Sequence, residues 1–342
     1  MKAGMLHARP APDECDAMAP LDHGGDLSAA RLRFPDAPEP WIDLSTGINP
    51  HAYPVRALPE DCFARLPEPS ALRALEEVAA RAYGVADART IIATPGAQAL
   101  IQMLPRALPG HRVGVLAPTY AEHAASWRRA GRTVVACADV SQLADCDIAV
   151  IVNPNNPTGR VIGRDTLLAL ARRTRLIVDE SFADLAPDES IAGDAAASGA
   201  IVLRSFGKTF GLAGVRLGFA IAPHDIATRL RDSLGPWPVS GPAIALGARA
   251  FADRDWLDAT RRRLADDAVR LDALLRATGF EIVGGTPLFR LAAQNRAQAI
   301  ADRLGRAGVH VRRFAEQPRW LRFGIPADSA WARLEAALRG SP

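Results

Sequence analysis

The sequence predicts an α/β protein, with a mostly parallel sheet in a large domain and a smaller α+β domain at the C-terminus. Short apolar segments alternate with helical segments between residues 90 and 203, which is typical of a parallel sheet connected by helices. Most of these apolar segments lack polar positions, as strands covered on both faces require. The 342 residues also exceed the usual size of a single hydrophobic core, so two domains are expected.

The N-terminal region is expected to form an arm. Residues 1–40 are rich in Pro, Ala and Asp and have little periodicity, which indicates an extended segment with a His-Gly-Gly turn at His23–Gly25. Helical spacing then starts at Ala71 and continues to Tyr83, where Gly84 is placed to end the helix.

The large domain is expected over residues 41–240 and contains the alternating elements. We expect strands at Thr90–Ala93, Val113–Leu116, Thr133–Ala136, Ile148–Val152, Leu176–Val178 and Ile201–Leu203. Helices are expected between them at Ala97–Leu108, Ala121–Ala130 and Asp165–Arg173. This order predicts a largely parallel sheet with helices packed on it.

The smaller domain is expected over residues 241–342. The turn Gly235–Pro238 interrupts the alternation, and a long helical segment, Ala243–Thr278, follows it. The later strands are expected at Glu281–Val283, Leu288–Leu291, Val309–Arg312 and Trp320–Phe323, with helices at Ala297–Ala307 and Ala327–Leu338. Strands and helices mixed in this way predict an α+β unit.

Composition argues against several classes of function. The net charge of +3 is spread without a basic block, so we expect no nucleic-acid partner. No segment approaches the roughly 20 apolar residues of a membrane span, and the N-terminus lacks a secretory signal, so we expect a cytoplasmic protein without membrane contact. The four cysteines lack zinc-ligand spacing, which predicts reduced thiols and no metal site; they are Cys15, Cys62, Cys137 and Cys146.

Lysine usage singles out one residue. Of the 41 basic residues only Lys2 and Lys208 are lysines, so Arg serves at almost every other cationic position. Lys208 lies among glycines and small residues in the segment Ser205–Gly218. A guanidinium does not deprotonate in proteins, whereas an amine can do so and then form an imine with an aldehyde. Lys208 is therefore a candidate imine-forming lysine, and the alternative is a surface lysine retained by chance.

Polar motifs at the ends of the expected strands add candidate ligand contacts. Residues 94–98, Thr-Pro-Gly-Ala-Gln, open a helix whose free N–H groups can hold a phosphate, and Gly96 permits close approach. The segment Asn153–Gly159 follows another strand, and its prolines would hold Asn156 toward a ligand. Each motif alone is also compatible with a simple helix start or a rigid turn. In an open α/β sheet, however, ligands bind at the carboxyl ends of strands.

Asp179 and a later group of polar residues extend this candidate site. Asp179 ends a buried strand, where a carboxylate needs a partner such as a protonated ring nitrogen; a turn cap is the alternative. Ser205, Lys208 and Arg216 share one segment, and Arg216 could pair with a phosphate.

Together, these motifs resemble the aspartate-aminotransferase-like superfamily, the fold type I pyridoxal-phosphate enzymes. The resemblance implies pyridoxal 5′-phosphate as the cofactor and a homodimer with its sites at the subunit interface. It implies that Lys208 carries the cofactor covalently, that Asp179 keeps its ring nitrogen protonated, and that Tyr120 stacks on its ring; these are the expected catalytic residues. The remaining implied cofactor contacts are Gly96, Ala97, Gln98, Asn156, Ser205 and Arg216.

The chain is more similar to one branch, the threonine-phosphate decarboxylases of cobalamin biosynthesis. This similarity is carried by His23–Asp26, Ile42–Pro50 and Pro236–Val239. It implies decarboxylation of L-threonine O-3-phosphate, a phosphorylated amino acid, to (R)-1-amino-2-propanol O-2-phosphate. Arg322 would bind the substrate carboxylate. The substrate phosphate would be bound by Arg312 or Arg313, together with His23.

Two positions depart from the pattern of the relatives. Phe182 stands where related aminotransferases usually carry a Tyr that donates to the cofactor's ring oxygen, and Phe fits the decarboxylase branch better. Leu66 stands where relatives often carry a Tyr that reaches the partner subunit's cofactor phosphate, so that contact is not expected. Two alternatives stay open, namely a histidinol-phosphate or related class I/II aminotransferase and a non-catalytic protein that keeps the fold for binding.

Overall fold

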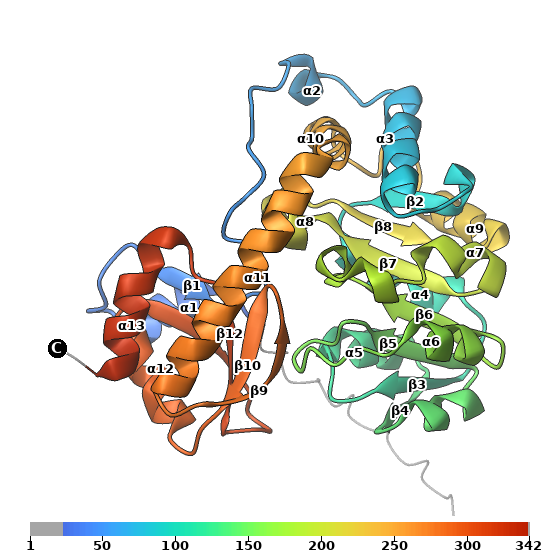
Figure 1. Ribbon diagram of the computed structural model, residues 1–342. Coiled ribbons are helices and arrows are strands. Elements are labelled where there is room, and N and C mark those ends of the chain that lie inside the picture. Colours follow the sequence, from blue (N-terminus) through green and yellow to red (C-terminus); the bar gives the residue numbers. More distant parts are fainter. Residues whose placement is uncertain (1–22, 341–342) are drawn as a thin grey trace, which may run out of the picture.

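The computed structural model describes residues 23–340, which form two lobes built around two sheets (Figure 1). Lys2, Cys15 and the rest of arm residues 1–22 lie outside the described residues, as do residues 341–342 of the predicted C-terminal domain. Helix α11, Arg254–Ala277, runs from the lobe of the larger sheet to the lobe of the smaller one (Figure 1). The predicted α/β class with a smaller second unit is confirmed.

The larger sheet contains seven strands in the order β2-β8-β7-β6-β5-β3-β4. Their bounds are β2 Ile91–Thr94, β3 Arg112–Leu116, β4 Thr133–Cys137, β5 Ile148–Val152, β6 Arg175–Asp179, β7 Ile201–Ser205 and β8 Gly218–Ile221. All neighbouring strands are parallel except β8, which is antiparallel to both β2 and β7. Strand β8 is absent from the prediction because its four residues directly continue the polar segment that carries Lys208.

Helices cover both faces of the larger sheet. One face packs against α3 Pro69–Ala82, α6 Arg164–Ala171 and α10 Gly241–Ala252, and the other against α4 Ala97–Ala107, α5 Ala121–Arg129 and α9 His224–Leu234. Short helices complete this lobe at α2 Asp61–Ala64, α7 Ala195–Ser198 and α8 Phe206–Thr209. Strand residues alternate between the two faces, so Val178 points toward α3 while Ile177 points toward α4. Within residues 23–340, no helix is long and apolar enough to cross a membrane.

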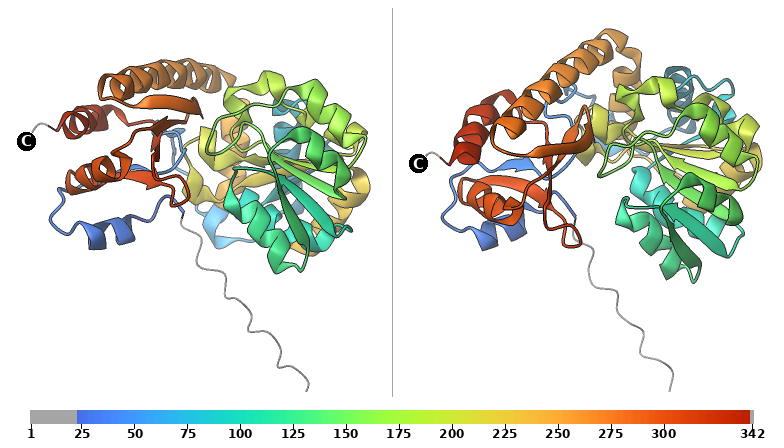
Figure 2. Two further views of the ribbon diagram at one scale, coloured as in Figure 1. Left: turned by 90° about the horizontal axis from the view of Figure 1, so that it is seen from below. Right: turned by 60° about the horizontal axis from the view of Figure 1, so that its bottom comes forward.

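The smaller sheet has five strands in the order β1-β11-β12-β10-β9. Their bounds are β1 Ile42–Leu44, β9 Glu281–Thr286, β10 Phe289–Ala293, β11 Val309–Arg313 and β12 Trp320–Gly324. Helices α12 Ala297–Arg306 and α13 Trp331–Arg339 lie on the outer side of this sheet, away from the larger lobe (Figure 2). The domain boundaries at residues 40 and 240 stay a prediction, but β1 pairs in parallel with β11 and so lies in the smaller sheet.

The predicted extended arm contains a helix within its described part. Residues Leu27–Arg33 form α1. The carboxylate of Asp26 caps this helix, because it accepts hydrogen bonds from the backbone N–H groups of Ser28 and Ala29, both at 3.0 Å. After α1, the Phe34 ring lies against Gly305 of α12 so closely that a Cβ on Gly305 would come within 2.3 Å of it. The expectation of extended backbone was wrong at these residues, because a capped seven-residue helix has too few turns to show a clear period.

The single helix predicted over residues 243–278 is two helices, α10 and α11. Asp253 leaves the helical backbone between them, and its carboxylate accepts a hydrogen bond from the N–H of Trp256 at 3.1 Å. An Asp at this position satisfies a free N–H of the next helix, which lets the chain change direction without losing hydrogen bonds. The break directs α11 away from the larger sheet toward the smaller one (Figure 1).

Candidate active site

The predicted site residues converge at the carboxyl ends of the central strands in the larger sheet. Strands β5, β6 and β7 are neighbours, and they lead into Asn153–Gly159, Asp179 and Lys208 respectively. Strand β2 leads into the turn at residues 94–98, and β3 is followed by the loop that carries Tyr120. Since these strands all run in the same direction, their following loops meet at one edge, where such sheets bind ligands.

The amine of Lys208, the candidate imine-forming group, lies at this edge. It lies 5.7 Å from the centroid of the Phe182 ring. Burial lowers its pKa from 10.5 to about 8, and the positive charges of Arg322 and Arg216 add to this effect, while Asp179 opposes it. An amine with such a pKa is largely neutral in mildly alkaline solution, which is the state that attacks a carbonyl carbon.

Asp179 is held as a carboxylate by an unpredicted residue, His123. The Nε2 atom of His123 lies 2.9 Å from one carboxylate oxygen, and the backbone N–H of Ser181 donates to the other at 3.0 Å. Burial by itself would raise the pKa of Asp179, but the contacts with His123 and Ser181 outweigh it and the pKa is lowered. His123 lies three residues after Tyr120 at the start of α5, and that one-turn spacing was the available signal in the sequence.

Gly96 and Arg216 lie together at the start of α4, where they could hold an anion. Gly96 has φ +85°, and a Cβ there would lie 2.6 Å from a guanidinium nitrogen of Arg216. The backbone N–H groups that open α4 at Ala97 receive no side-chain cap. From the other side Gly218 of β8 approaches the backbone of Ala97, and it pairs with Ser205 at the end of β7. A helix N-terminus beside a guanidinium suits a phosphate group.

Tyr120 and Gln98 belong to a hydrogen-bonded chain that reaches the N-terminal segment. The Tyr120 hydroxyl donates to the side-chain oxygen of Gln98 at 3.3 Å, and the Gln98 amide donates to Glu122 at 3.2 Å. The other oxygen of Glu122 lies 3.2 Å from Nε2 of His23, whose ring centroid is 5.7 Å from that of Tyr120. Burial raises the pKa of Tyr120 to about 12, so its hydroxyl stays protonated. Glu122 was not predicted, because nothing in its local sequence marks it.

Arg322 links the two lobes beside this site. Its guanidinium donates to the backbone oxygen of Ser45 at 2.6 Å and to the side-chain oxygen of Asn156, which leaves the Asn156 amide to donate elsewhere. Its Nε is buried without a hydrogen-bond partner among the described residues. Burial lowers the pKa of Arg322 to about 10, and the positive charge of Arg312 contributes. Burial of a charged guanidinium is unfavourable, and an anion bound beside Arg322 would compensate for the lost hydration.

The two arginines at the end of β11 point in different directions. Arg312 stands opposite Arg322 in the antiparallel pairing of β11 and β12, so the two side chains share one face of the sheet. Arg313 points the other way, and its guanidinium donates to Asp302 of α12 at 2.7 Å. The structure therefore brings Arg312, but not Arg313, to the candidate site.

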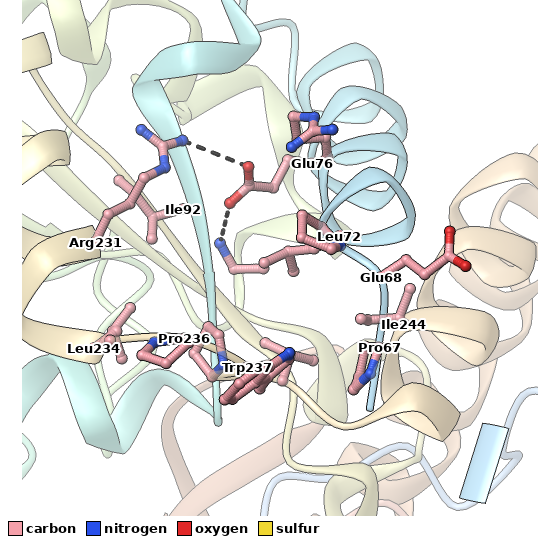
Figure 3. A pocket seen from close by; sticks show the side chains of 16 residues that line it. Pro67, Glu68, Leu72, Glu76, Ile92, Arg231, Leu234, Pro236, Trp237 and Ile244 are labelled. Carbon is pink, nitrogen blue, oxygen red and sulfur yellow. Dashed lines mark hydrogen bonds and ion pairs between the residues drawn. The ribbon is translucent and has the colours of Figure 1, made fainter. Parts of the chain in front are cut away.

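A cavity of about 390 Å³ lies elsewhere in the larger lobe (Figure 3). Its lining includes Pro67, Leu72, Pro236 and Trp237, and none of the predicted catalytic residues. Its walls are mostly apolar, and the charged side chains among them include Glu76 and Arg231, which pair with each other at 3.5 Å. In the described part of the chain, no group of three or more His, Cys, Asp or Glu side chains is placed to hold a metal ion.

Comparison with known proteins identifies the family to which this arrangement belongs. The family model described as aminotransferase class I and II matches residues 39–339. The chain belongs to this family. Relatives within the family align with the chain over nearly its whole length. Threonine-phosphate decarboxylase of Pseudomonas aeruginosa is 45% identical over 94% of this chain and 98% of the relative, and that of Sinorhizobium sp. is 41% identical over 92% and 96%.

A solved structure shows the same fold at much lower sequence identity. The crystal structure of histidinol-phosphate aminotransferase from Sinorhizobium meliloti, in complex with pyridoxal-5′-phosphate, covers 96% of this chain and 100% of its own. The TM-score is 0.79 at 19% identity. This aminotransferase thus shares the fold of the chain.

We predict that replacing Arg322 by Gln raises the pKa of the Lys208 amine in the cofactor-free protein. The guanidinium disfavours the protonated amine, so its removal moves the pKa from about 8 toward 10.5. The measurement is the pH dependence of acetylation at Lys208, followed by peptide mass spectrometry. Since Lys2 is the other lysine of the chain, the Lys208 peptide is easily distinguished.

Arg319→Gln is the matched control, because Arg319 is exposed on the turn that leads into β12. The Arg319→Gln variant loses the same positive charge, and the pKa of the Lys208 amine should stay unchanged in it. An unchanged or lower pKa in Arg322→Gln would contradict the electrostatic argument.

Proposed function

We propose that the chain is a pyridoxal-phosphate-dependent decarboxylase that converts L-threonine O-3-phosphate to (R)-1-amino-2-propanol O-2-phosphate. The observation that carries this proposal is the pair of guanidinium groups on facing positions of β11 and β12, with Arg322 close enough to lower the pKa of Lys208. Two cations beside one amine suit a substrate with both a carboxylate and a phosphate. The names of the 45% and 41% identical relatives agree with this substrate.

The residues at the site fit pyridoxal 5′-phosphate. The cofactor needs an amine for its aldehyde, an anion cradle for its phosphate and a carboxylate for its ring nitrogen. Lys208 would supply the amine, the start of α4 with Arg216 the cradle, and Asp179 the carboxylate. The steric demand at Gly96 supports the cradle, since any side chain there would displace Arg216. When bound, the cofactor supplies an electron sink for cleavage of a bond to the substrate's α-carbon.

The chain's own residues orient the substrate and move protons. Arg322 would hold the carboxylate so that the bond to it, and not the bond to hydrogen, is the one that breaks. The carboxylate leaves as carbon dioxide, and the α-carbon gains one proton in its place. Lys208 is our candidate for the donor of this proton, because a pKa of about 8 lets its amine release and accept a proton near neutral pH.

Phe182 separates this proposal from the aminotransferase alternative. Its side chain is buried against Phe289, 5.2 Å between ring centroids, and offers no hydroxyl to a ring oxygen. Histidinol-phosphate aminotransferases are also similar, at 32% identity over 94% of this chain, but the threonine-phosphate decarboxylases are more similar, at 45% and 41%. A non-catalytic role is disfavoured because Lys208, Asp179 and Arg216 are all in place. The role in cobalamin biosynthesis and the cytoplasmic location stay predictions.

The holoenzyme should release carbon dioxide from L-threonine O-3-phosphate over many turnovers in the absence of a keto acid. A decarboxylase regenerates its cofactor in each cycle, whereas an aminotransferase stops after one half-reaction until a keto acid arrives. The measurement is carbon dioxide and phosphorylated amine per mole of enzyme, with and without a keto acid. Product formed only with the keto acid present would exclude the proposed reaction.

Replacing Arg312 by Ala should reduce kcat/KM for L-threonine O-3-phosphate far more than for unphosphorylated threonine. Loss of a charged hydrogen bond to the phosphate corresponds to roughly a 10- to 100-fold decrease. Arg313→Ala is the matched control, because Arg313 pairs with Asp302, and both substrates should keep their kinetics in that variant. Equal losses for the two substrates in Arg312→Ala would remove Arg312 from the phosphate pocket.

We also propose that the protein is a homodimer, as expected for this family. Large apolar side chains are exposed on the segment around α2 and at the turn before α10: Val55 is 62% exposed, Phe63 70%, Leu66 65% and Trp237 55%. The two segments meet at the cavity of Figure 3, which Pro67 and Trp237 both line. A second copy of the chain would cover these exposed side chains, which supports the proposal.

Light scattering at micromolar concentration should therefore give the mass of two chains. The double variant Phe63→Asp/Leu66→Asp should shift the protein toward monomer, because two charges would be buried without partners. The control Leu32→Asp, at a residue that is 86% exposed on α1, should leave the mass unchanged. A wild-type monomer with cofactor bound would refute the dimer.

A further inference from the structure

A buried cation, Arg204, lies directly behind the candidate active site. Its guanidinium donates to the carboxylate of Glu180 at 2.6 Å and to that of Asp184 at 2.5 Å. The guanidinium carbon also lies 4.3 Å from the centroid of the Tyr83 ring. Arg204 is 4% exposed and Glu180 1%, so this network is shielded from water.

The network occupies the face of the sheet opposite to the site. Strand residues alternate, so Asp179 and Ser205 point toward α4 and the site, while Glu180 and Arg204 point toward α3. The pairing of β6 with β7 continues past Asp179, because the N–H of Glu180 donates to the backbone oxygen of Leu203 at 2.8 Å. The contact between Arg204 and Glu180 thus joins the carboxyl ends of β6, which ends at Asp179, and of β7, which leads into the helix that carries Lys208.

The second contact fixes the loop that follows β6. Glu180 and Asp184 flank Phe182, so Arg204 holds this short loop on both sides of the ring that lies against Lys208. The backbone oxygen of Asp184 also accepts a hydrogen bond from Arg261 of α11 at 2.9 Å. The loop is therefore tied to the sheet through Arg204 and to the helix between the lobes through Arg261.

We propose that Arg204 is a positioning residue for the reaction, because it bridges Glu180 and Asp184 and thereby keeps Phe182 packed over the Lys208 amine. The inference rests on the proposed function only in taking Lys208 as the cofactor-bearing lysine. A guanidinium is suited to this task, since its planar fork can bind two carboxylates at once whereas an ammonium is a point charge. Burial lowers the pKa of Lys208 more than any other cause, so a displaced Phe182 would admit water and let that pKa rise.

The test uses the full-length, cofactor-free chain and the acetylation titration of Lys208. Asp184→Asn removes one charge from the network but keeps an oxygen that can accept from Arg204. We expect it to raise the pKa of Lys208 by at least half a unit. Arg204→Lys keeps the positive charge but not the fork, and it should raise the same pKa.

Glu76→Gln is the matched control for lost stability. Glu76 is also a buried carboxylate paired with an arginine, Arg231, and it accepts a hydrogen bond from Ala93 at the edge strand β2, away from Lys208. This variant should lower the urea midpoint of unfolding and leave the titration of Lys208 unchanged. If Asp184→Asn lowers the midpoint but moves the titration no more than Glu76→Gln does, the network is only structural and the proposal is wrong.

A double variant tests whether the effect passes through Phe182. Phe182→Ala should raise the pKa of Lys208, and adding Asp184→Asn should then change it little, because the ring that the network holds is already absent. Additive shifts would show that the network acts on Lys208 by another route and would overturn the proposal. This titration needs no substrate, so it can succeed or fail independently of the decarboxylation assay.

Discussion

An ammonium group loses favourable hydration when it is buried, and the arrangement around Lys208 follows from that cost. Burial, with the charges of Arg322 and Arg216, lowers the pKa of the amine to about 8, and Asp179 limits the decrease. These charges come from β12, from the segment before β8 and from the end of β6. The reactivity of one side chain therefore depends on the order of the strands in the larger sheet and on the placement of the smaller lobe.

The two lobes meet at the same place. Arg322 of the smaller sheet donates to Asn156, which belongs to a loop of the larger sheet. Backbone and rings approach closely around this contact: a Cβ on Gly47 would lie 2.9 Å from Phe289 and 3.0 Å from Phe182, and one on Gly159 would lie 2.1 Å from a backbone oxygen. Because these positions tolerate no larger side chain, the contact between the lobes is set by sterics as well as by charge.

The larger sheet uses its two faces for different purposes. Consecutive residues at the end of β6 point to opposite sides, so Asp179 enters the site while Glu180 enters the buried network with Arg204. A charge on either face would be costly if it were unpaired, and each is satisfied by a partner from another element. Adjacent residues of one strand therefore serve the candidate site, through Asp179, and the buried network behind it, through Glu180.

The sequence by itself determined the α/β class, the six parallel strands and the local motifs around Lys208, because apolar periodicity and turn chemistry act over a few residues. It did not determine β8, the break at Asp253 or the helix α1, since each is short and local propensity there is weak. The roles of His123, Glu122 and Arg204 were decided only by tertiary structure. Their partners are distant in the chain, Asp179 for His123 and His23 for Glu122, so even the one-turn spacing of His123 from Tyr120 does not indicate the partner. The same reason separates Arg312 from Arg313: they are neighbours in the sequence, but the alternation of β11 turns one toward Arg322 and the other toward Asp302.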